Sequence, residues 1–382
     1  MNNRDFIRQA PRTESSSNRS GSIWRFVHTD PPLLVGLILI CCFGLLVLYS
    51  ASDGNETVVR RQALVIVVGI LAMFIVSQFN VHVFRSWALS MYGAGLALLA
   101  LVLIIGVEAG GARSWIDLPG IPSFQPSEIM KIVVPLMIAW YLGSRPLPPR
   151  FKHLFWSALM ILIPAVLIII QNDTGTAIMV MMSGLFVVLL AGIRWRIVIT
   201  GFLALLLASP AWYLFLAPEH IKSRILTVFN PYLDPTGAGY NIIQSQIAIG
   251  SGGVYGKGYG NGAQSHLDFI PESNTDFILA VLAEEFGLLG ILFLICLYLF
   301  ILLRSSYIAY SAKDMFSRLL AGSITLTFFM YVFVNMAMVS GLLPVIGLPL
   351  PLISRGGTAI VTFFVCFGLL MSIQTHGRLK ES

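Results

Sequence analysis

The sequence predicts an all-α protein that spans a membrane about ten times. Of its 382 residues, 57% are hydrophobic and only 11% are charged, whereas a typical soluble domain has roughly 25% charged residues. Apolar runs recur along the chain, and each is long enough to cross a bilayer as a helix of ~20 residues. All four cysteines lie inside these runs, so we expect no disulfide framework.

The chain divides into one membrane domain and two short tails. Residues 1–30 are expected to form a disordered tail, because this stretch begins with polar residues rich in Ser, Asn and Arg. The membrane domain covers 31–377, and 378–382 form the second tail. Its ten expected helices lie near 32–51, 62–79, 87–107, 126–143, 154–171, 176–193, 197–217, 276–303, 319–341 and 358–373.

The connections between these helices differ greatly in length. A tight polar turn, 172–175, joins the fifth and sixth helices, and a large loop, 218–275, joins the seventh and eighth. A loop of this length in a membrane domain indicates function. Within it, residues 238–249 predict a short amphipathic helix that lies on the membrane.

Lysine and arginine are distributed unevenly between the two sides. Of the 24, sixteen fall in the tails and in the loops on the same side, seven fall on the other side, and Lys131 lies inside a helix. By the positive-inside rule both termini are cytoplasmic. The short cytoplasmic loops contain no glycine-rich phosphate loop, so chemistry driven by intracellular ATP is not expected. The polar, glycine-rich stretches then face outward: 108–125, 172–175, 218–275 and 341–357.

Asp276 stands where the large outward loop enters the eighth helix. The residues before it are mostly polar, and 277–303 are apolar except for Glu284 and Glu285. A carboxylate at the edge of a bilayer must keep access to water or to a partner, because full burial as an ion costs several kcal/mol or more. We therefore interpret Asp276 as a working acid.

Positively charged residues near the fourth helix suit an anionic ligand. Glu128 and Lys131 are three apart and share one helix face. They form either an ion pair that only locks packing, or a site in which Lys131 binds an anion and Glu128 orients it. Upstream, Arg113 can hold a phosphate through its planar guanidinium, and Trp115 can anchor at the membrane interface.

Other outward polar residues are candidates for lining a cavity. Asp173 in the tight turn is expected to cap the following helix, with a cavity role as the alternative. The large loop contributes Gln244, Ser245 and Lys257 among glycines that allow close backbone approach to a sugar or phosphate. Ordinary turns contain the same residue types.

Two further glutamates lie deeper along the eighth helix. Glu284 and Glu285 are eight and nine residues beyond Asp276, hence ~12–14 Å deeper at helical rise. Hydrogen bonding to neighbouring helices near Gly287 and a catalytic role are equally consistent with this depth. Arg355, just before the tenth helix, is a further candidate for the cavity.

Several motifs occur in a family-specific order: Gly111-Ala112-Arg113-Ser114-Trp115, Phe124-Gln125-Pro126-Ser127-Glu128 with Lys131, Gln244-Ser245 to Gly260, Thr275-Asp276-Phe277-Ile278, and Pro349-Leu350-Pro351-Leu352. With them, residues 30–377 resemble the SEDS (shape, elongation, division and sporulation) family. The segments 283–285, 347–351 and 371–376 resemble its RodA branch more than its FtsW branch.

The chain departs from RodA-like sequences in three places. Asn172-Asp173-Thr174 stands where Pro-Asp-Leu is expected, Asn274 stands where His is expected, and Arg355 stands where Tyr is expected. These places lie beside the expected site. The acid, the lysine and the glutamate named above match the family.

The resemblance implies a peptidoglycan glycosyltransferase that polymerises lipid II at the outer face of the inner membrane during cell elongation and rod-shape maintenance. Asp276 would be the general base, Arg113 and Lys131 would stabilise diphosphate charge, and Glu128 would hold Lys131. A divalent cation, Mg²⁺ or Mn²⁺, would be the one cofactor, assisting Arg113 and Lys131. The implied partners are lipid II, a class B penicillin-binding protein, other elongation-complex proteins and membrane lipid, with no nucleic acid.

Two other functions remain as alternatives. A flippase or transporter for lipid-linked precursors would also have intramembrane charges, but its polar residues should follow a path through both leaflets. Here they gather on the outward side. The third possibility is a non-catalytic scaffold that activates a penicillin-binding protein.

Overall fold

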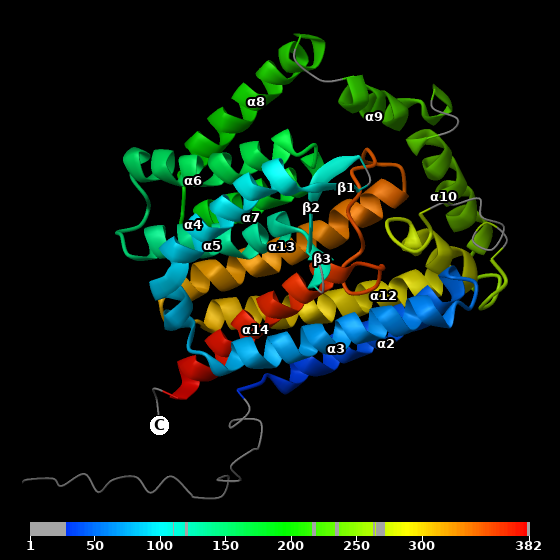
Figure 1. Cartoon of the computed structure of the whole chain (residues 1–382), viewed down its shortest axis with the longest axis horizontal. Helices are drawn as coiled ribbons and strands as arrows, with labels where there is room; N and C mark the ends of the chain where they lie inside the picture. The colour runs from blue at the N-terminus through cyan, green and yellow to red at the C-terminus, as the bar shows by residue number, and fades with distance from the viewer. Residues whose placement is uncertain are drawn as a thin grey trace, which may run out of the picture.

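Figure 1 shows long helices lying side by side, with α8 leaning away from the others and the shorter helices α9 and α10 at the edge of the bundle. The computed structural model describes residues 28–109, 111–118, 121–215, 219–233, 237–262, 264 and 272–379. The expected tails, 1–30 and 378–382, lie almost entirely outside the described residues.

The chain is a multi-pass membrane protein of mostly helical structure. Eight helices among the described residues are long and apolar enough to cross a membrane, while α5 and α7 fall short of that standard. The count of ten spans therefore stays a prediction. The helices that match the ten expected segments are α2 (Pro31–Ala51), α3 (Glu56–Gln78), α4 (Val81–Ile105), α5 (Pro126–Gly143), α6 (Phe151–Ile170), α7 (Thr174–Leu190), α8 (Trp195–Phe215), α12 (Ile278–Ser311), α13 (Met315–Val339) and α14 (Gly357–Leu379).

Polar caps fix where several helices begin. The side chains of Asp30, Asn55 and Asp314 each accept a hydrogen bond from a backbone N–H in the first turn of α2, α3 and α13. Asn55 starts α3 before its apolar run, so Arg60 and Arg61 lie within a helix and not in the expected loop.

A small antiparallel sheet fills the connection between α4 and α5. Its strands, in the order β1-β2-β3, are Val107–Ala109, Ala112–Leu118 and Ile121–Phe124. Ser114 and Ile116 are each 2% exposed, while Trp115 between them is less buried, as expected for the two-residue period of a strand. The sequence predicted only an outward loop here, so the sheet is an addition to the all-α expectation.

The large loop contains helices of its own, namely α9 (Glu219–Phe229), the 3₁₀ turn η1 (Pro231–Leu233) and α10 (Ala238–Gly252). The predicted helix over 238–249 corresponds to α10. Its buried residues Ile242, Ser245 and Ala248 recur at a spacing of three and face α12 and α13. Residues 218, 234–236, 263 and 265–271 of the loop lie outside the described residues.

The sequence predicted one continuous eighth helix, but α12 is interrupted at Gly287 (φ 63°, ψ −159°). The loop that follows α10 supplies the backbone hydrogen bonds that the break removes. N–H groups of this loop donate to carbonyls of α12 residues that precede Gly287. N–H groups of α12 residues that follow Gly287 donate to carbonyls of the loop. The four bonds are Lys257 N to Glu284 O (3.0 Å), Gly258 N to Glu285 O (3.1 Å), Leu288 N to Gly253 O (3.0 Å) and Leu289 N to Val254 O (3.2 Å).

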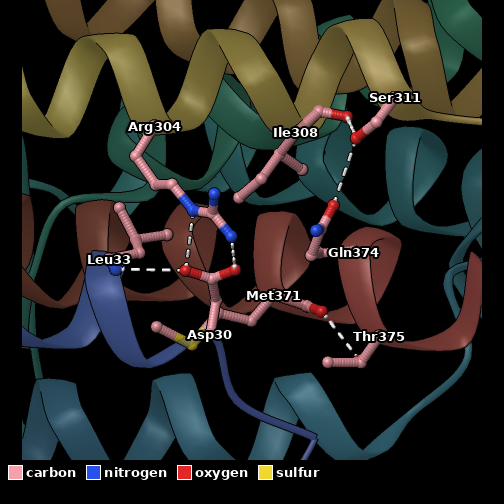
Figure 2. A network of polar contacts seen from close by, with 8 residues as sticks. All are labelled: Asp30, Leu33, Arg304, Ile308, Ser311, Met371, Gln374 and Thr375. Atoms are coloured by element: carbon pink, nitrogen blue, oxygen red, sulfur yellow. Dashed lines mark hydrogen bonds and ion pairs between the residues drawn. The ribbon is translucent and has the colours of Figure 1, made fainter. Parts of the chain in front are cut away.

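A polar network ties three helices together where α2 begins (Figure 2). Asp30, 3% exposed, accepts hydrogen bonds from Arg304 Nε (3.0 Å) and Nη2 (2.6 Å), which joins α2 to α12. Ser311 donates to Gln374 Oε1 (3.2 Å) and joins α12 to α14. Asp276, by contrast, lies at the start of α12, so this network and Asp276 are at opposite ends of the bundle.

Candidate active site

Asp276 lies in the turn that leads into α12. The N–H groups of Thr275 and Phe277 both donate to Glu272 O (3.1 and 3.2 Å) and close this turn. Burial, with a smaller contribution from the charge of Glu272, raises the pKa of Asp276 from 3.8 to about 6. A carboxylate with its pKa near the working pH is suited to general base catalysis.

The end of α13 and the loop that follows it hold the Asp276 turn. Asn335 of α13 donates from Nδ2 to the carbonyl oxygens of Asp276 (2.9 Å) and Leu348 (2.7 Å). Arg355 N donates to Asn274 O (2.9 Å), and the Arg355 side chain is exposed. The loop 340–356 therefore packs directly against the turn, with one of the candidate cations beside it.

Glu128 and Lys131 form the ion pair that their spacing predicted. The Lys131 ammonium contacts Glu128 Oε1 and lies 4.5 Å from the centre of the Tyr331 ring. Only 5% of Lys131 and 6% of Glu128 is exposed. In this conformation the contact of Lys131 with Tyr331 joins α5 to α13, and an anion could reach Lys131 only after its pair with Glu128 opens.

Asp173 links the first turns of two helices. Its Oδ1 accepts from Thr176 N (3.0 Å), which is the expected cap of α7. Its Oδ2 accepts from Gln125 Nε2 (2.5 Å), immediately before α5. Asn172, one of the departures, has φ 62°, a left-handed conformation that asparagine tolerates and proline cannot adopt.

Three helix N-termini converge at the Asp276 end of the bundle. The starts of α5 and α7 are joined through Asp173, and a Cβ at Gly175 of α7 would lie 2.5 Å from Ile346 O. A Cβ at Gly347 would in turn lie 3.6 Å from Asp276 Oδ2, just before α12. Helix N-termini carry partial positive charge and free N–H groups, so this end of the bundle favours an anion such as a diphosphate.

Arg113 binds backbone carbonyls at the end of α4. Its guanidinium donates to Gly106 O (2.7 Å) and Ile104 O (3.0 Å), and its backbone N–H donates to Gln171 O (3.0 Å). The side chain is exposed. A guanidinium has five N–H donors, so donors remain for a phosphate.

The candidate residues of the large loop have structural partners. The Ser245 hydroxyl, 0% exposed, donates to Ile242 O (2.9 Å) and Val339 O (2.8 Å) and fastens α10 to α13. Gln244 beside it is half-buried. The Lys257 ammonium lies 2.7 Å from Glu284 Oε1. Ser245 and Lys257 therefore hold the loop in place in this structure.

The two deep glutamates also hold neighbouring segments. Glu284, 0% exposed, accepts from Gln264 N (3.1 Å) as well as from Lys257. Glu285, 1% exposed, accepts from the Ser50 hydroxyl of α2. Of the two interpretations of these residues, the contacts agree with hydrogen bonding to neighbouring segments.

Asn335, Tyr331 and Gly347 contribute to this region although the sequence did not single them out. An asparagine inside an apolar helix is a visible signal, because a buried amide needs partners. Its partners are backbone carbonyls, which no residue pattern identifies. Tyr331 and Gly347 give no comparable signal, since aromatic residues and glycines are common in membrane helices and their loops.

Comparison with known proteins identifies relatives over nearly the whole chain. Residues 32–379 match the FtsW/RodA/SpoVE family model, which is described as a cell cycle protein. The chain is 44% identical over 360 residues to the peptidoglycan glycosyltransferase MrdB of Escherichia coli (strain K12), covering 94% of this chain and 96% of that protein. It is 36% identical over 364 residues to the probable peptidoglycan glycosyltransferase FtsW of Geobacter sulfurreducens (strain DL-1 / KN400), covering 92% and 96%.

Solved structures of similar proteins share the fold of this chain. One, described as "Structural coordination of polymerization and crosslinking by a peptidoglycan synthase complex", has a chain that matches with a TM-score of 0.80 and 30% identity over 91% of this chain and 97% of that chain. The rod shape determining protein RodA of Thermus thermophilus matches with a TM-score of 0.70 and 28% identity over 91% and 97%. The chain belongs to the SEDS family of membrane proteins, the family of FtsW, RodA and SpoVE.

Proposed function

We propose that this protein is a peptidoglycan glycosyltransferase that polymerises lipid II, with Asp276 as its general base. The relatives described above are named as a peptidoglycan glycosyltransferase and a probable peptidoglycan glycosyltransferase. The observation that carries the proposal for the site is the position of Asp276, a partly buried carboxylate with its pKa raised to about 6, at the end of the bundle where α5, α7 and α12 begin. A base and an anion-favouring surface are the two features that this transfer requires.

The groups at the Asp276 end of the bundle can carry out each step of the glycan transfer. Asp276 takes the proton from the acceptor sugar hydroxyl, and the hydroxyl oxygen attacks the anomeric carbon of the donor. The bond between that carbon and the diphosphate breaks, and its electron pair leaves on the diphosphate oxygen. Developing negative charge there is stabilised by the helix N-termini and by exposed Arg355 and Arg113, and by Lys131 once its pair with Glu128 opens.

A divalent cation would fit this site only together with the substrate. No group of three His, Cys, Asp or Glu side chains within the described residues could hold a metal ion by itself. Mg²⁺ is usually held by one or two carboxylates and by substrate phosphates, and Asp276 beside a diphosphate matches that donor set. When bound, the cation would neutralise charge on the diphosphate.

We also propose that the Asp276 end faces the outside of the inner membrane and that both termini are cytoplasmic. The support is the excess of lysine and arginine in the loops on the side of the termini. The network around Asp30 and Arg304 makes the opposite end of α2 and α12 tightly packed, with Asp30 3% exposed.

The proposed partner is a class B penicillin-binding protein. A structure similar to this chain is described as a peptidoglycan synthase complex that coordinates polymerisation with crosslinking. Direct contact would let the transpeptidase receive the growing strand as it is made. The contact is expected to involve the transmembrane helix of the transpeptidase and the loops of this chain at the Asp276 end, including the proline-rich stretch before Arg355. Recovery of the pair in mild detergent is expected.

Polymerisation of lipid II by the purified protein, supplied with its transpeptidase partner, tests this function. Asp276→Asn should lower the rate by ~10²–10⁴, the usual contribution of a positioned base. Asp117→Asn is the matched control, because Asp117 is an exposed carboxylate on β2 and should be dispensable. If Asp276→Asn is active and Glu284→Gln is inactive, the general base is Glu284, deeper in the bundle, and not Asp276. A wild-type pair that binds lipid II without polymerising it would favour the scaffold or flippase.

A further inference from the structure

Asn335 is a buried amide in the otherwise apolar outer half of α13. We infer that Asn335 is a positioning residue for glycan transfer, fixing the Asp276 turn one helical turn away from the Lys131–Glu128 pair. This inference rests on the proposed role of Asp276 as the base. Asn335 itself is 0% exposed and does not touch the substrate.

Both hydrogen bonds of the Asn335 amide end on backbone that borders the Asp276 carboxylate. One goes to the carbonyl of Asp276 itself (2.9 Å). The other goes to the carbonyl of Leu348 (2.7 Å), next to Gly347, where an added Cβ would lie 3.6 Å from Asp276 Oδ2. A single NH₂ group therefore fixes the residue that carries the acid and the loop that covers it.

The same face of α13 also contacts Lys131, the cation of the ion pair. Tyr331 lies four residues before Asn335, so the two side chains are neighbours on one face of α13, separated by ~6 Å along the axis. The Tyr331 ring lies 4.5 Å from the Lys131 ammonium. One turn of α13 is thus a rigid spacer between the base and the positive charge expected to face the leaving group.

Simple packing does not account for an amide at this position. An apolar side chain would fill the space without the desolvation cost of a buried amide. Moreover, Asn335 Oδ1 has no hydrogen-bond partner among the described residues, so half of the amide is unsatisfied. What the amide provides is the pair of N–H bonds, and both serve the surroundings of Asp276.

Loss of these bonds should affect the chemical step more than substrate binding. The Asp276 turn would shift relative to the bound sugar, and a misplacement of ~1 Å commonly costs about 10²-fold in rate. Water would also reach the carboxylate more easily, so its ionisation would move toward lower pH. A residue with only a packing role would change neither quantity in a folded protein.

The test compares full-length Asn335→Ser and Asn335→Leu with the wild type, each assayed with lipid II and the transpeptidase partner. Serine keeps one donor in place of two, and leucine keeps the volume without donors. Ser323→Ala is the matched control, because Ser323 is also a 0% exposed polar residue of α13 and donates to Ser183 O (2.6 Å) far from Asp276. The measurements are kcat, KM, the acid limb of the pH profile and Tm.

We expect kcat to fall at least about tenfold in Asn335→Ser and about 10²-fold in Asn335→Leu, with KM within about twofold of the wild type. The acid limb should shift to lower pH in both, while Ser323→Ala lowers only Tm. If Asn335→Leu does not fold, Asn335→Ser decides alone, since its shorter side chain carries a single O–H in place of two N–H donors. Wild-type kcat and an unshifted acid limb in a folded Asn335 variant overturn the inference. Full activity of Asp276→Asn would instead overturn the proposed function.

Discussion

At the scale of single residues, the chain uses charge in two different surroundings. Asp276 lies at the edge of the bundle, where burial raises its pKa to about 6, but its side chain keeps some exposure. Glu128, Lys131 and Glu284 are almost fully enclosed and paired. The sequence could identify Asp276, because an acid between a polar loop and an apolar run is visible in the residue pattern. It could not decide the role of Glu284, whose partner Lys257 comes from a loop that folds back onto the helix.

The raised pKa of Asp276 predicts the acid limb of the pH profile. A base acts when it is deprotonated, so kcat should be half-maximal near pH 6 and should rise to a plateau above it. An ordinary aspartate, with a pKa of ~3.9, would already be at its plateau near pH 6. Glu272→Gln should move the limb slightly lower, because the charge of Glu272 contributes to the upward shift. A half-maximal pH near 4 in the wild type would contradict this prediction.

The raised pKa of Asp276 also predicts the stability of the Asp276→Asn variant. Because the folded-state pKa lies above the unfolded-state value, ionisation of Asp276 costs stability, and this cost appears as pH rises through that interval. At pH near 7 the neutral asparagine avoids the cost. Asp276→Asn should therefore unfold at a Tm no lower than that of the wild type. An inactive variant with a markedly lower Tm could not be interpreted as loss of the base.

Lys131 can be tested through its partner. Lys131→Met leaves Glu128 buried and unpaired, so the variant should lose stability by about 3–5 kcal/mol as well as activity. The double variant Glu128→Gln with Lys131→Met removes both charges and should recover most of the stability. If Lys131 serves the diphosphate, the double variant stays inactive when assayed with lipid II. Recovered polymerisation would assign the pair to packing alone.

At the scale of elements, the long helices could be predicted and their interruptions could not. Apolar runs located the ten helices to within a few residues at most ends, because hydrophobic length is a local property of the sequence. The break at Gly287 depends on a loop about thirty residues earlier that supplies the missing hydrogen bonds. The strands between α4 and α5 are short and pair only with one another, so their alternation is too brief to predict a sheet.

The inserted loop predicts which glycines cannot be replaced. A Cβ at Gly256 would lie 2.0 Å from Glu285 O, and one at Gly287 would lie 2.4 Å from Gly256 N. Both residues also have positive φ, so alanine adds backbone strain of roughly 1–3 kcal/mol. We expect Gly256→Ala and Gly287→Ala to lower Tm and to increase proteolysis of the loop 253–262.

Gly250→Ala is the control for this pair. Gly250 lies in α10, where an added Cβ meets nothing within 4 Å, and its φ is not positive. Alanine favours helix over glycine by about 1 kcal/mol, so Tm should stay the same or rise. Equal losses of Tm in all three variants would mean that loop insertion does not contribute to the stability of α12.

At the scale of the whole molecule, function is concentrated at one end of the bundle. Asp276 before α12, Asn335 of α13 and Asp173 before α7 lie there together with the loop 340–356. At the other end, Asp30 and Arg304 close the contact between α2 and α12 (Figure 2). The sequence predicted which loops face the same side, because the alternation of spans fixes it. It could not predict which of their residues touch, since packing of the helices against one another decides that.

The lipid-facing surface of the bundle predicts where a partner helix packs. A groove of about 320 Å³ lies between α12 and α13, and its lining is almost entirely apolar, including Tyr298, Leu302, Phe333 and Ala337. Small residues let helices approach closely within a membrane, and Ala337 and Ser340 provide them near the Asp276 end. We expect the transmembrane helix of the transpeptidase to occupy this groove.

Filling the groove should therefore separate the complex without unfolding the protein. Leu299→Trp places a bulky side chain where the partner helix would pack, because Leu299 lines this groove and is 50% exposed, and it should reduce co-purification in mild detergent by about tenfold or more. Val83→Trp is the matched control, because Val83 lines a second apolar groove, between α3 and α4, and is 45% exposed. That variant should bind the partner normally. Normal recovery of the pair with a folded Leu299→Trp would show that the partner helix packs elsewhere. Loss of the pair with Val83→Trp alone would instead indicate that it packs between α3 and α4.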